Sequence, residues 1–146
     1  MPYVLDTDTI TALQHNHPAV VSRVEAVPAV DLFVAIVSCE EQVAGRLHAL
    51  HGQLSAERLV EAYQRLQQTL RFLATVNILP FNHVAARQDM EFRGLYGRMG
   101  SGDRRIAAIA WVNRCTLVTR NTIHFQGIAG LALENWIDVP PPPSLD

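Results

Sequence analysis

The chain has 146 residues, of which 49% are hydrophobic, and this length fits one domain whose core needs no disulfide or structural metal. The net charge of -2 and the isoelectric point near 6.3 exclude the strongly basic surface of proteins that coat duplex nucleic acid. No apolar run approaches the roughly 18 residues of a membrane span and no leader-like segment opens the chain. We therefore expect a cytoplasmic protein that makes no membrane contact.

Charge and cysteine usage add two constraints. All 12 basic residues are arginine, and seven of them lie between Arg87 and Arg120, so a locally basic segment surrounds Asp103. Cys39 and Cys115 stand in apolar surroundings without the spacing of a zinc site. We expect both to be buried free thiols.

The first half of the chain alternates apolar runs with helical patterns. Residues 3–5 predict a short strand that ends at Asp6, and one of the three polar residues after Asp6 is expected to cap the next helix. Pro18 starts a second helix. Residues 32–37 are almost continuously apolar, as in a strand covered on both faces, and Ser38 is the expected cap of the helix that follows.

The second half continues this alternation. Ser55 caps a long amphipathic stretch, Pro80 places a short strand near a sheet edge, and Asn82 caps a further helix. Gly100 and Gly102 predict a flexible loop. In chain order we expect a helix at 55–75, a strand at 78–81, helices at 82–97 and from 103, a strand at 116–119, a turn at 121–125 and a strand at 131–136, making one domain of residues 1–139 with a Pro-rich tail at 140–146.

Strands that alternate with helices predict an α/β fold with a mostly parallel sheet. In such sheets ligands bind beyond the carboxyl ends of the strands. Asp6, Glu41 and Asn121 each follow one of these ends, and Asp103 begins a helix that is expected to pack beside them. The topology therefore predicts that four oxygen-bearing side chains meet at one edge of the sheet.

Carboxylates that lie together repel one another unless a cation or a proton offsets the charge. Oxygen ligands without histidine or cysteine favour Mg²⁺ or Mn²⁺, ions that bind phosphate substrates and activate water. Arg104, Arg105 or Arg120 could hold the flanking phosphates. Each acid taken alone also has a purely structural interpretation, as a helix cap or as a first-turn acid.

The segment YVLDTDT also resembles the nucleophile loop of haloacid dehalogenase-type phosphatases, in which the first aspartate attacks phosphorus. Those enzymes use a lysine, or less often an arginine, beside the phosphate and a downstream pair of aspartates on the metal. This chain has no lysine and offers only Asp103 in the matching Gly-Asp context. The phosphatase therefore remains a secondary alternative.

A second resemblance covers nearly the whole chain. Six segments together resemble the PIN-domain ribonucleases, and among them the VapC toxins of bacterial toxin–antitoxin pairs. In order they are YVLDTDT from Tyr3, SCEEQVAG from Ser38, LPF at 79–81, GSGDRRIAA from Gly100, LVTRNT from Leu117 and GLALENW from Gly130. The resemblance implies a PIN-like three-layer α/β/α sandwich and an RNA-cleaving homodimer that uses Mg²⁺ or Mn²⁺.

The resemblance also implies roles for single residues. Asp6, Glu41 and Asp103 match the three principal acids, which hold the metal, and Asn121 matches a fourth catalytic position that is Asp or Asn in relatives. Thr7 and Thr119 match hydroxyl residues that support the pocket in relatives. Two positions differ from the usual pattern: Asp8 stands where relatives more often have Asn, and His124 stands where an acid is common.

The family further implies an antitoxin partner, and the groove between the 55–75 helix and the early helices is a candidate surface for it. A different class of function is also open, in which the protein is a catalytically silent module that grips RNA or a partner without cutting.

Overall fold

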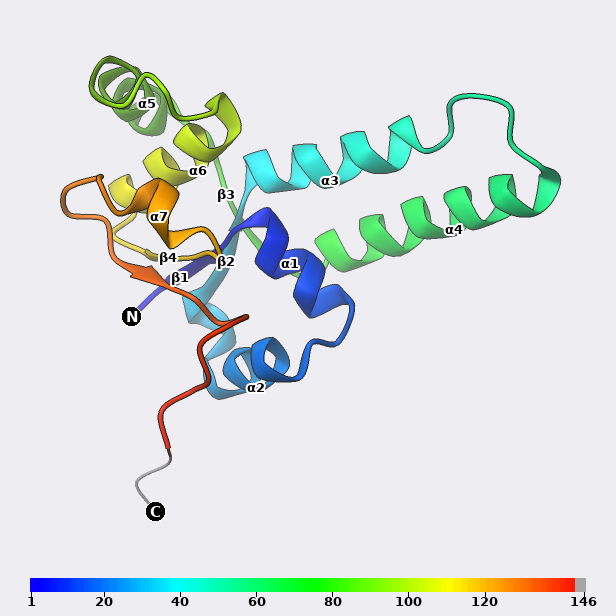
Figure 1. The fold of residues 1–146 in the computed structure, drawn as a ribbon, viewed down its shortest axis with the longest axis horizontal. Helices are drawn as coiled ribbons and strands as arrows, with labels where there is room; N and C mark the ends of the chain where they lie inside the picture. The colour runs from blue at the N-terminus through cyan, green and yellow to red at the C-terminus, as the bar shows by residue number, and fades with distance from the viewer. Residues whose placement is uncertain (144–146) are drawn as a thin grey trace.

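Five parallel strands form the centre of the molecule in the order β3-β2-β1-β4-β5 (Figure 1). Tyr3 of β1 pairs with Leu32 of β2 and with Thr116 of β4, and every neighbouring pair of strands in the computed structural model is parallel. The strands are β1 Tyr3–Leu5, β2 Leu32–Ala35, β3 Asn77–Leu79, β4 Thr116–Val118 and β5 Leu133–Glu134. The expected mostly parallel sheet is thus wholly parallel in residues 1–143, which the structure describes.

Helices connect the strands and cover both faces of the sheet (Figure 1). The helices α3 and α4 lie antiparallel and project away from the sheet as an arm. Their bounds are α1 Thr7–Gln14, α2 Pro18–Ala26, α3 Ile36–His48, α4 Ala56–Leu73, α5 His83–Leu95, α6 Ser101–Val112 and α7 Thr122–Phe125, with a 3₁₀ turn at Ala29–Asp31. None of the helices in the described part of the chain is long and apolar enough to cross a membrane.

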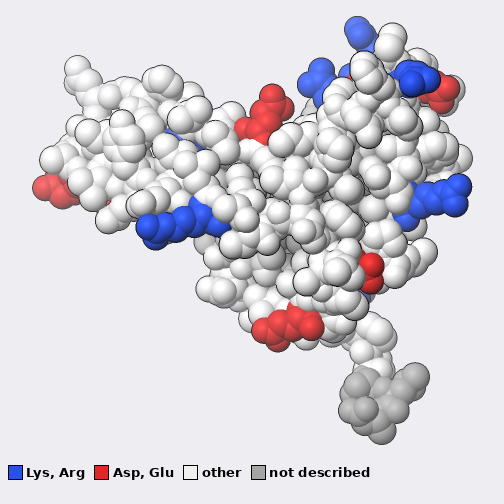
Figure 2. Space-filling model, turned by 180° about the vertical axis from the view of Figure 1, so that it is seen from behind, with Lys and Arg blue, Asp and Glu red and all other residues white. Residues whose placement is uncertain are grey.

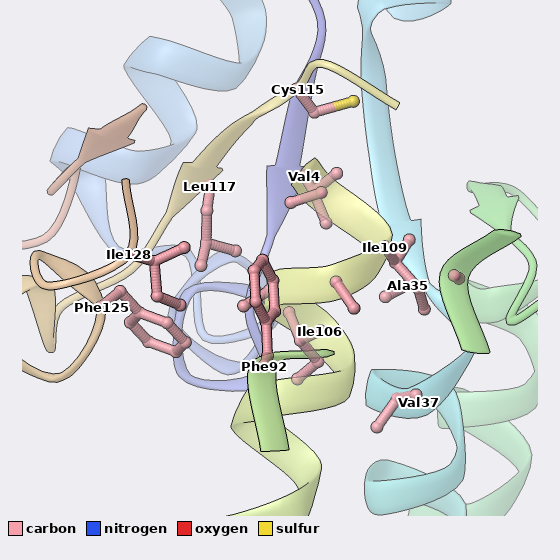
Figure 3. Close-up of a cluster of buried hydrophobic side chains, with 14 residues drawn as sticks. Val4, Ala35, Val37, Phe92, Ile106, Ile109, Cys115, Leu117, Phe125 and Ile128 are labelled. Carbon is pink, nitrogen blue, oxygen red and sulfur yellow. The ribbon is translucent and has the colours of Figure 1, made fainter. Parts of the chain in front are cut away.

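Successive residues of a strand point to opposite faces of the sheet, so in β1 and β4 they contribute to two different hydrophobic cores. Val4 and Leu117 point into a cluster shared with α5, α6 and α7 (Figure 3). Leu5 and Val118, the next residues along, point into a cluster shared with α1 and α2. The predicted three-layer α/β/α sandwich is therefore confirmed.

Several predicted boundaries are confirmed. The Ser55 side chain accepts a hydrogen bond from the amide of Arg58 at the start of α4, and Asn82 accepts one from Ala85 at the start of α5. The strand expected at 78–81 is an edge strand, but it spans Asn77–Leu79, so it begins one residue earlier and ends before Pro80. Both cysteines are buried free thiols, and burial raises the pKa of each.

Two helices do not begin at the cap expected from the turn residues. The cap of α1 is not one of the three polar residues after Asp6 but Asp6 itself, whose carboxylate accepts a hydrogen bond from the Thr9 amide at 2.9 Å, so the structural interpretation of this acid as a helix cap is confirmed. The helix α3 begins at Ile36 and not after Ser38, so residues 36 and 37 are helical and Glu41 is its sixth residue. The reason is that an unbroken apolar run has the same pattern in a buried strand and in the first turn of a buried helix.

The glycine-rich loop and the C-terminal strand are shorter than expected. The helix α6 already begins at Ser101, with Gly100 at its cap position, so Gly102 is helical. The strand β5 contains only two residues. Residues 140–143 of the expected tail have no helix or strand, and residues 144–146 lie outside the described residues.

Candidate metal and nucleic-acid site

Asp6 is a buried carboxylate at the carboxyl end of β1, with 8% of its surface exposed. It accepts hydrogen bonds from the Thr9 amide and from the Thr119 side chain, but it takes part in none of the ion pairs formed within residues 1–143. Desolvation raises the pKa of Asp6 in spite of these hydrogen bonds, and the nearby charge of Asp8 acts in the same direction. A cation at this position would therefore relieve an electrostatic cost.

Glu41 lies between the end of β1 and the start of α6. Its Oε2 accepts a hydrogen bond from the Thr7 hydroxyl at 2.5 Å, which ties α3 to the residue after Asp6. Its Oε1 would lie 2.6 Å from a Cβ atom at Gly102, the residue before Asp103. Only a glycine at position 102 leaves room for this carboxylate.

Asp103 lies in the first turn of α6 and is half-buried. Its Oδ2 is 3.9 Å from Nδ1 of His124 in α7, and both side chains line a hollow of about 640 Å³ beside Tyr96 and Arg98. The turn expected at 121–125 is the short helix α7. His124 thus lies next to Asp103. An acidic residue at position 124 would repel the Asp103 carboxylate.

Asn121 precedes α7, and its backbone N–H donates a hydrogen bond to the Thr119 hydroxyl at 3.0 Å. Because the Thr119 side chain also contacts Asp6, this threonine links the two residues. Asp8 is exposed in the first turn of α1. Thr7 and Thr119 are therefore in hydrogen-bond contact with the predicted acids.

The predicted site residues Asp6, Glu41 and Asp103 lie at one end of the sheet, but their carboxylates do not surround a single metal position. Among residues 1–143, no group of three His, Cys, Asp or Glu side chains is close enough to hold a metal ion directly. The donor set nevertheless fits a hard cation, because it consists of oxygen atoms and includes a buried, desolvated carboxylate. Mg²⁺ keeps several waters when it binds to proteins, so it needs few direct contacts.

Two of the three arginines expected to hold phosphates instead pair with aspartates of this chain. Arg104 is buried, and its Nε lies 2.7 Å from Oδ1 of Asp89. Arg120 forms two hydrogen bonds to Asp138, at 3.1 and 3.0 Å. Arg105 lines a different hollow, beside Glu40. Basic side chains do gather at the end of the molecule where α5 lies (Figure 2).

Sequence reasoning missed two features of this region. One is the contact between Gly102 and Glu41, for which the Gly-Ser-Gly run was the available signal. The other is a polar groove of about 650 Å³ that starts at Thr7 and Glu41 and contains Arg46 and Arg65. Those two arginines lie outside the basic segment between Arg87 and Arg120, so charge patterning along the chain did not indicate them.

No protein-family description matches the chain by sequence, and no curated protein matches it either. Solved structures do match it. The DNA-bound VapBC from Salmonella typhimurium is 20% identical with a TM-score of 0.78, and VapBC-1 from nontypeable Haemophilus influenzae is 24% identical with a TM-score of 0.76; each match covers 93% of this chain and 98% of the other. FitAcB from Neisseria gonorrhoeae is 25% identical with a TM-score of 0.69, over 94% of this chain and 99% of the other.

These matches extend over nearly the full length of both chains, so they concern the whole fold and not one motif. The fold that they share with this chain is, in this chain, a wholly parallel five-stranded sheet between two helical layers. In its fold as well as in its motifs, the chain resembles the VapC-type PIN-domain toxins of toxin–antitoxin systems.

Proposed function

We propose that the protein is a metal-dependent endoribonuclease toxin that hydrolyses phosphodiester bonds of structured RNA. The observation that carries this proposal is the buried Asp6 carboxylate, which has no cationic partner within residues 1–143 and lies at the same end of the sheet as Glu41 and Asp103. The likeness to VapBC structures supports the toxin class.

Asp6, Glu41 and Asp103 would hold Mg²⁺ or Mn²⁺, with Asn121 completing the shell directly or through water. The ion would supply a polarised phosphodiester oxygen and a water of lowered pKa. Thr7 and Thr119 keep the carboxylates of Glu41 and Asp6 in fixed orientations, because each hydroxyl contacts one of them.

Single-stranded loops of a folded RNA suit this site best, because splayed bases and kinked backbones there can reach a recessed carboxylate. The reaction places water across one phosphodiester bond and leaves two RNA fragments. No covalent enzyme intermediate is needed, which distinguishes this proposal from the phosphatase alternative with its aspartyl-phosphate on Asp6.

The test is cleavage of a structured RNA with Mg²⁺ or Mn²⁺ by the wild type and by Asp6→Ala and Asp103→Ala. We expect each substitution to lower kcat/KM by at least about 100-fold, with Glu61→Ala on the exposed side of α4 as the control. Equal cutting by all four proteins would remove the proposed site. RNA binding without cutting by the wild type would indicate the silent module, and hydrolysis of small phosphomonoesters would indicate the phosphatase.

We further propose that a cognate antitoxin neutralises the protein in the cytoplasm. Exposed apolar patches often mark surfaces that bind another protein. Along α4 the large exposed apolar side chains are Leu59, Val60, Tyr63 and Leu70. Co-expression with the neighbouring small open reading frame should abolish toxicity and nuclease activity together. Unchanged toxicity would remove this partner.

A homodimer is the second assembly that we propose. The helix α5 also exposes large apolar side chains, namely Val84, Met90 and Leu95. Light scattering after size-exclusion chromatography should give twice the 16.2 kDa mass of one chain, and Met90→Glu should give the mass of one chain. A single-chain mass for the wild type would contradict the dimer.

A further inference from the structure

The polar groove of about 650 Å³ beside the candidate site runs between α1, α3 and α4. Thr7 and Glu41 stand at its catalytic end, and Arg46 and Arg65 line it as well. Apart from the half-buried Phe72 and the exposed Gly45, its other lining residues carry hydroxyl, amide or imidazole groups. The groove therefore offers hydrogen bonds and positive charge along its length.

Arg46 is held in place by a buried residue. Its Nε donates a hydrogen bond to Oγ1 of Thr69 at 3.0 Å, and Thr69 is only 3% exposed. This bond uses one of the five guanidinium N–H groups and leaves the terminal amino groups for a ligand. Because its orientation is already fixed, Arg46 loses less side-chain entropy when it binds an anion.

The wall between α1 and α3 is also fixed. Gln14 and Gln42 exchange two hydrogen bonds of 3.0 Å through their side-chain amides. This pair holds α1 against α3, and the bond between Arg46 and Thr69 joins α3 to α4, so side-chain hydrogen bonds connect all three helices that line the groove. The groove is therefore a preformed surface and not a gap that closes around its ligand.

The charge of the groove points to an anionic ligand. Arg46 and Arg65 line the groove together with one carboxylate, that of Glu41, and none of the three takes part in the ion pairs formed within residues 1–143. Guanidinium groups recognise phosphate through paired hydrogen bonds. A ligand that carries repeated phosphates and continues into the site at Glu41 fits both the charge and the continuity.

We propose that this groove binds the phosphate backbone of single-stranded RNA on one side of the scissile bond, through Arg46 and Arg65. The proposal rests on the proposed nuclease function and adds the path that the substrate follows. It assigns to the substrate the groove between α4 and the early helices that was the candidate surface for the antitoxin, and leaves to the antitoxin the exposed apolar side chains of α4. Both arginines are then determinants of substrate affinity, and neither touches the reacting phosphate.

The test measures binding of a short fluorescein-labelled oligouridine in EDTA, which prevents cutting, at salt concentrations from about 50 to 200 mM. Replacing one arginine that contacts a phosphate should reduce the slope of log K against log salt by about 0.7. We expect this change for Arg65→Gln and for Arg46→Gln, and twice that change for the double variant. Arg58→Gln lies on the same helix as Arg65 but outside the groove, and it should bind as the wild type does.

Kinetics with Mg²⁺ give a second readout. Loss of a contact remote from the reacting phosphate should raise KM several-fold and leave kcat unchanged. The Arg65 side chain forms no hydrogen bond to another side chain within residues 1–143, so Arg65→Gln should not disturb folding. It therefore tests binding even if Arg46→Gln weakens the fold by removing the hydrogen bond to Thr69.

The outcomes distinguish this inference from the function on which it rests. If the wild type cuts RNA but Arg65→Gln and Arg46→Gln match Arg58→Gln in affinity and salt slope, the groove proposal is overturned and the nuclease stands. If both variants lose affinity for a hexaglutamate peptide but keep their affinity for RNA, the groove accepts an acidic peptide and the RNA proposal is again overturned. A wild type that neither binds nor cuts RNA removes the proposed function itself.

Discussion

At the scale of single residues, Asp6 shows how a buried carboxylate in a candidate site can oppose stability. Its pKa is raised by burial, so in the window between its ordinary value of 3.8 and its raised value the folded protein binds more protons than the unfolded chain. The free energy of unfolding therefore falls as pH rises through this window and stays lower above it. Natural binding sites often retain such a cost because the charge is needed for a ligand.

We expect Asp6→Asn to be more stable than the wild type at neutral pH in EDTA. The amide oxygen can still accept the hydrogen bond from Thr9, while the cost of burying a charge disappears. Each kcal/mol gained should raise Tm by roughly 2–4 °C, and the gain should vanish as pH falls below 3.8. Thermal unfolding across pH measures this. Asp8→Asn, an exposed neighbour, is the control, and a lower Tm for Asp6→Asn at pH 7 would contradict the burial argument.

Gly102→Ala should separate function from stability. The added Cβ would lie 2.6 Å from Oε1 of Glu41, the end of a flexible side chain, so the carboxylate can turn away and give up its bond to Thr7. Alanine also has a higher helix propensity than glycine, although at the second residue of α6 the gain should be smaller than the roughly 1 kcal/mol of a helix interior. We expect unchanged or higher Tm together with a loss of RNA cleavage of about tenfold or more.

The matched control for this variant is Gly94→Ala in α5, where nothing lies within 4 Å of the added Cβ. It should gain the same helical stability and cleave RNA at the wild-type rate. Full activity of Gly102→Ala would show that the position of Glu41 does not matter for cleavage.

At the scale of elements, the pair Asp89 and Arg104 joins α5 to the first turn of α6, next to Asp103. Both side chains are buried, at 8% exposure each. Removing one partner of such a pair leaves an uncompensated buried charge, whereas replacing both by apolar residues is often neutral. This contact therefore fixes the element that presents Asp103.

We expect Asp89→Ala to lower the free energy of unfolding by about 3–5 kcal/mol in urea denaturation. The double variant Asp89→Leu with Arg104→Met should recover most of that loss, because no charge then remains buried. A single substitution that costs less than about 1 kcal/mol would place the pair in contact with solvent.

Some helix starts were predictable from a capping residue, and others were not. Ser55 and Asn82 stand before amphipathic stretches, and both cap the expected helices. The start of α3 was missed because Ala35 supplies no side-chain cap, and the start of α6 was missed because Gly100 likewise supplies none. A side chain that satisfies the free amides is one local signal for a helix start, and the proline at the first position of α2, Pro18, is another.

The same distinction applies to the candidate site. Its position at the carboxyl end of the strands follows from topology, and that is why Asp6, Glu41 and Asn121 could be assigned to one edge from sequence. The commitment of Arg104 to Asp89 and the alignment of Arg46 by Thr69 depend on packing between distant segments. No periodicity or spacing along the chain encodes those contacts.

At the scale of the whole molecule, the two cores hold the sheet from both sides while its carboxyl end carries the acids. The layers can be stable without a metal, because their large buried side chains, such as Phe125 and Trp136, lie within apolar clusters. Metal binding should therefore add stability to a protein that is already folded and should not be required for folding.

We expect Mg²⁺ or Mn²⁺ to raise Tm as its concentration rises, because an ion that binds only the folded protein stabilises it by mass action. At 100 times its dissociation constant the gain is about 2.7 kcal/mol, which for a chain of 146 residues corresponds to a rise of roughly 5–10 °C. The measurement is thermal unfolding against metal concentration, with NaCl of equal ionic strength to remove screening effects. Asp103→Asn should lose most of the rise. An equal rise for the wild type and for Asp103→Asn would mean that the ion binds elsewhere on the molecule.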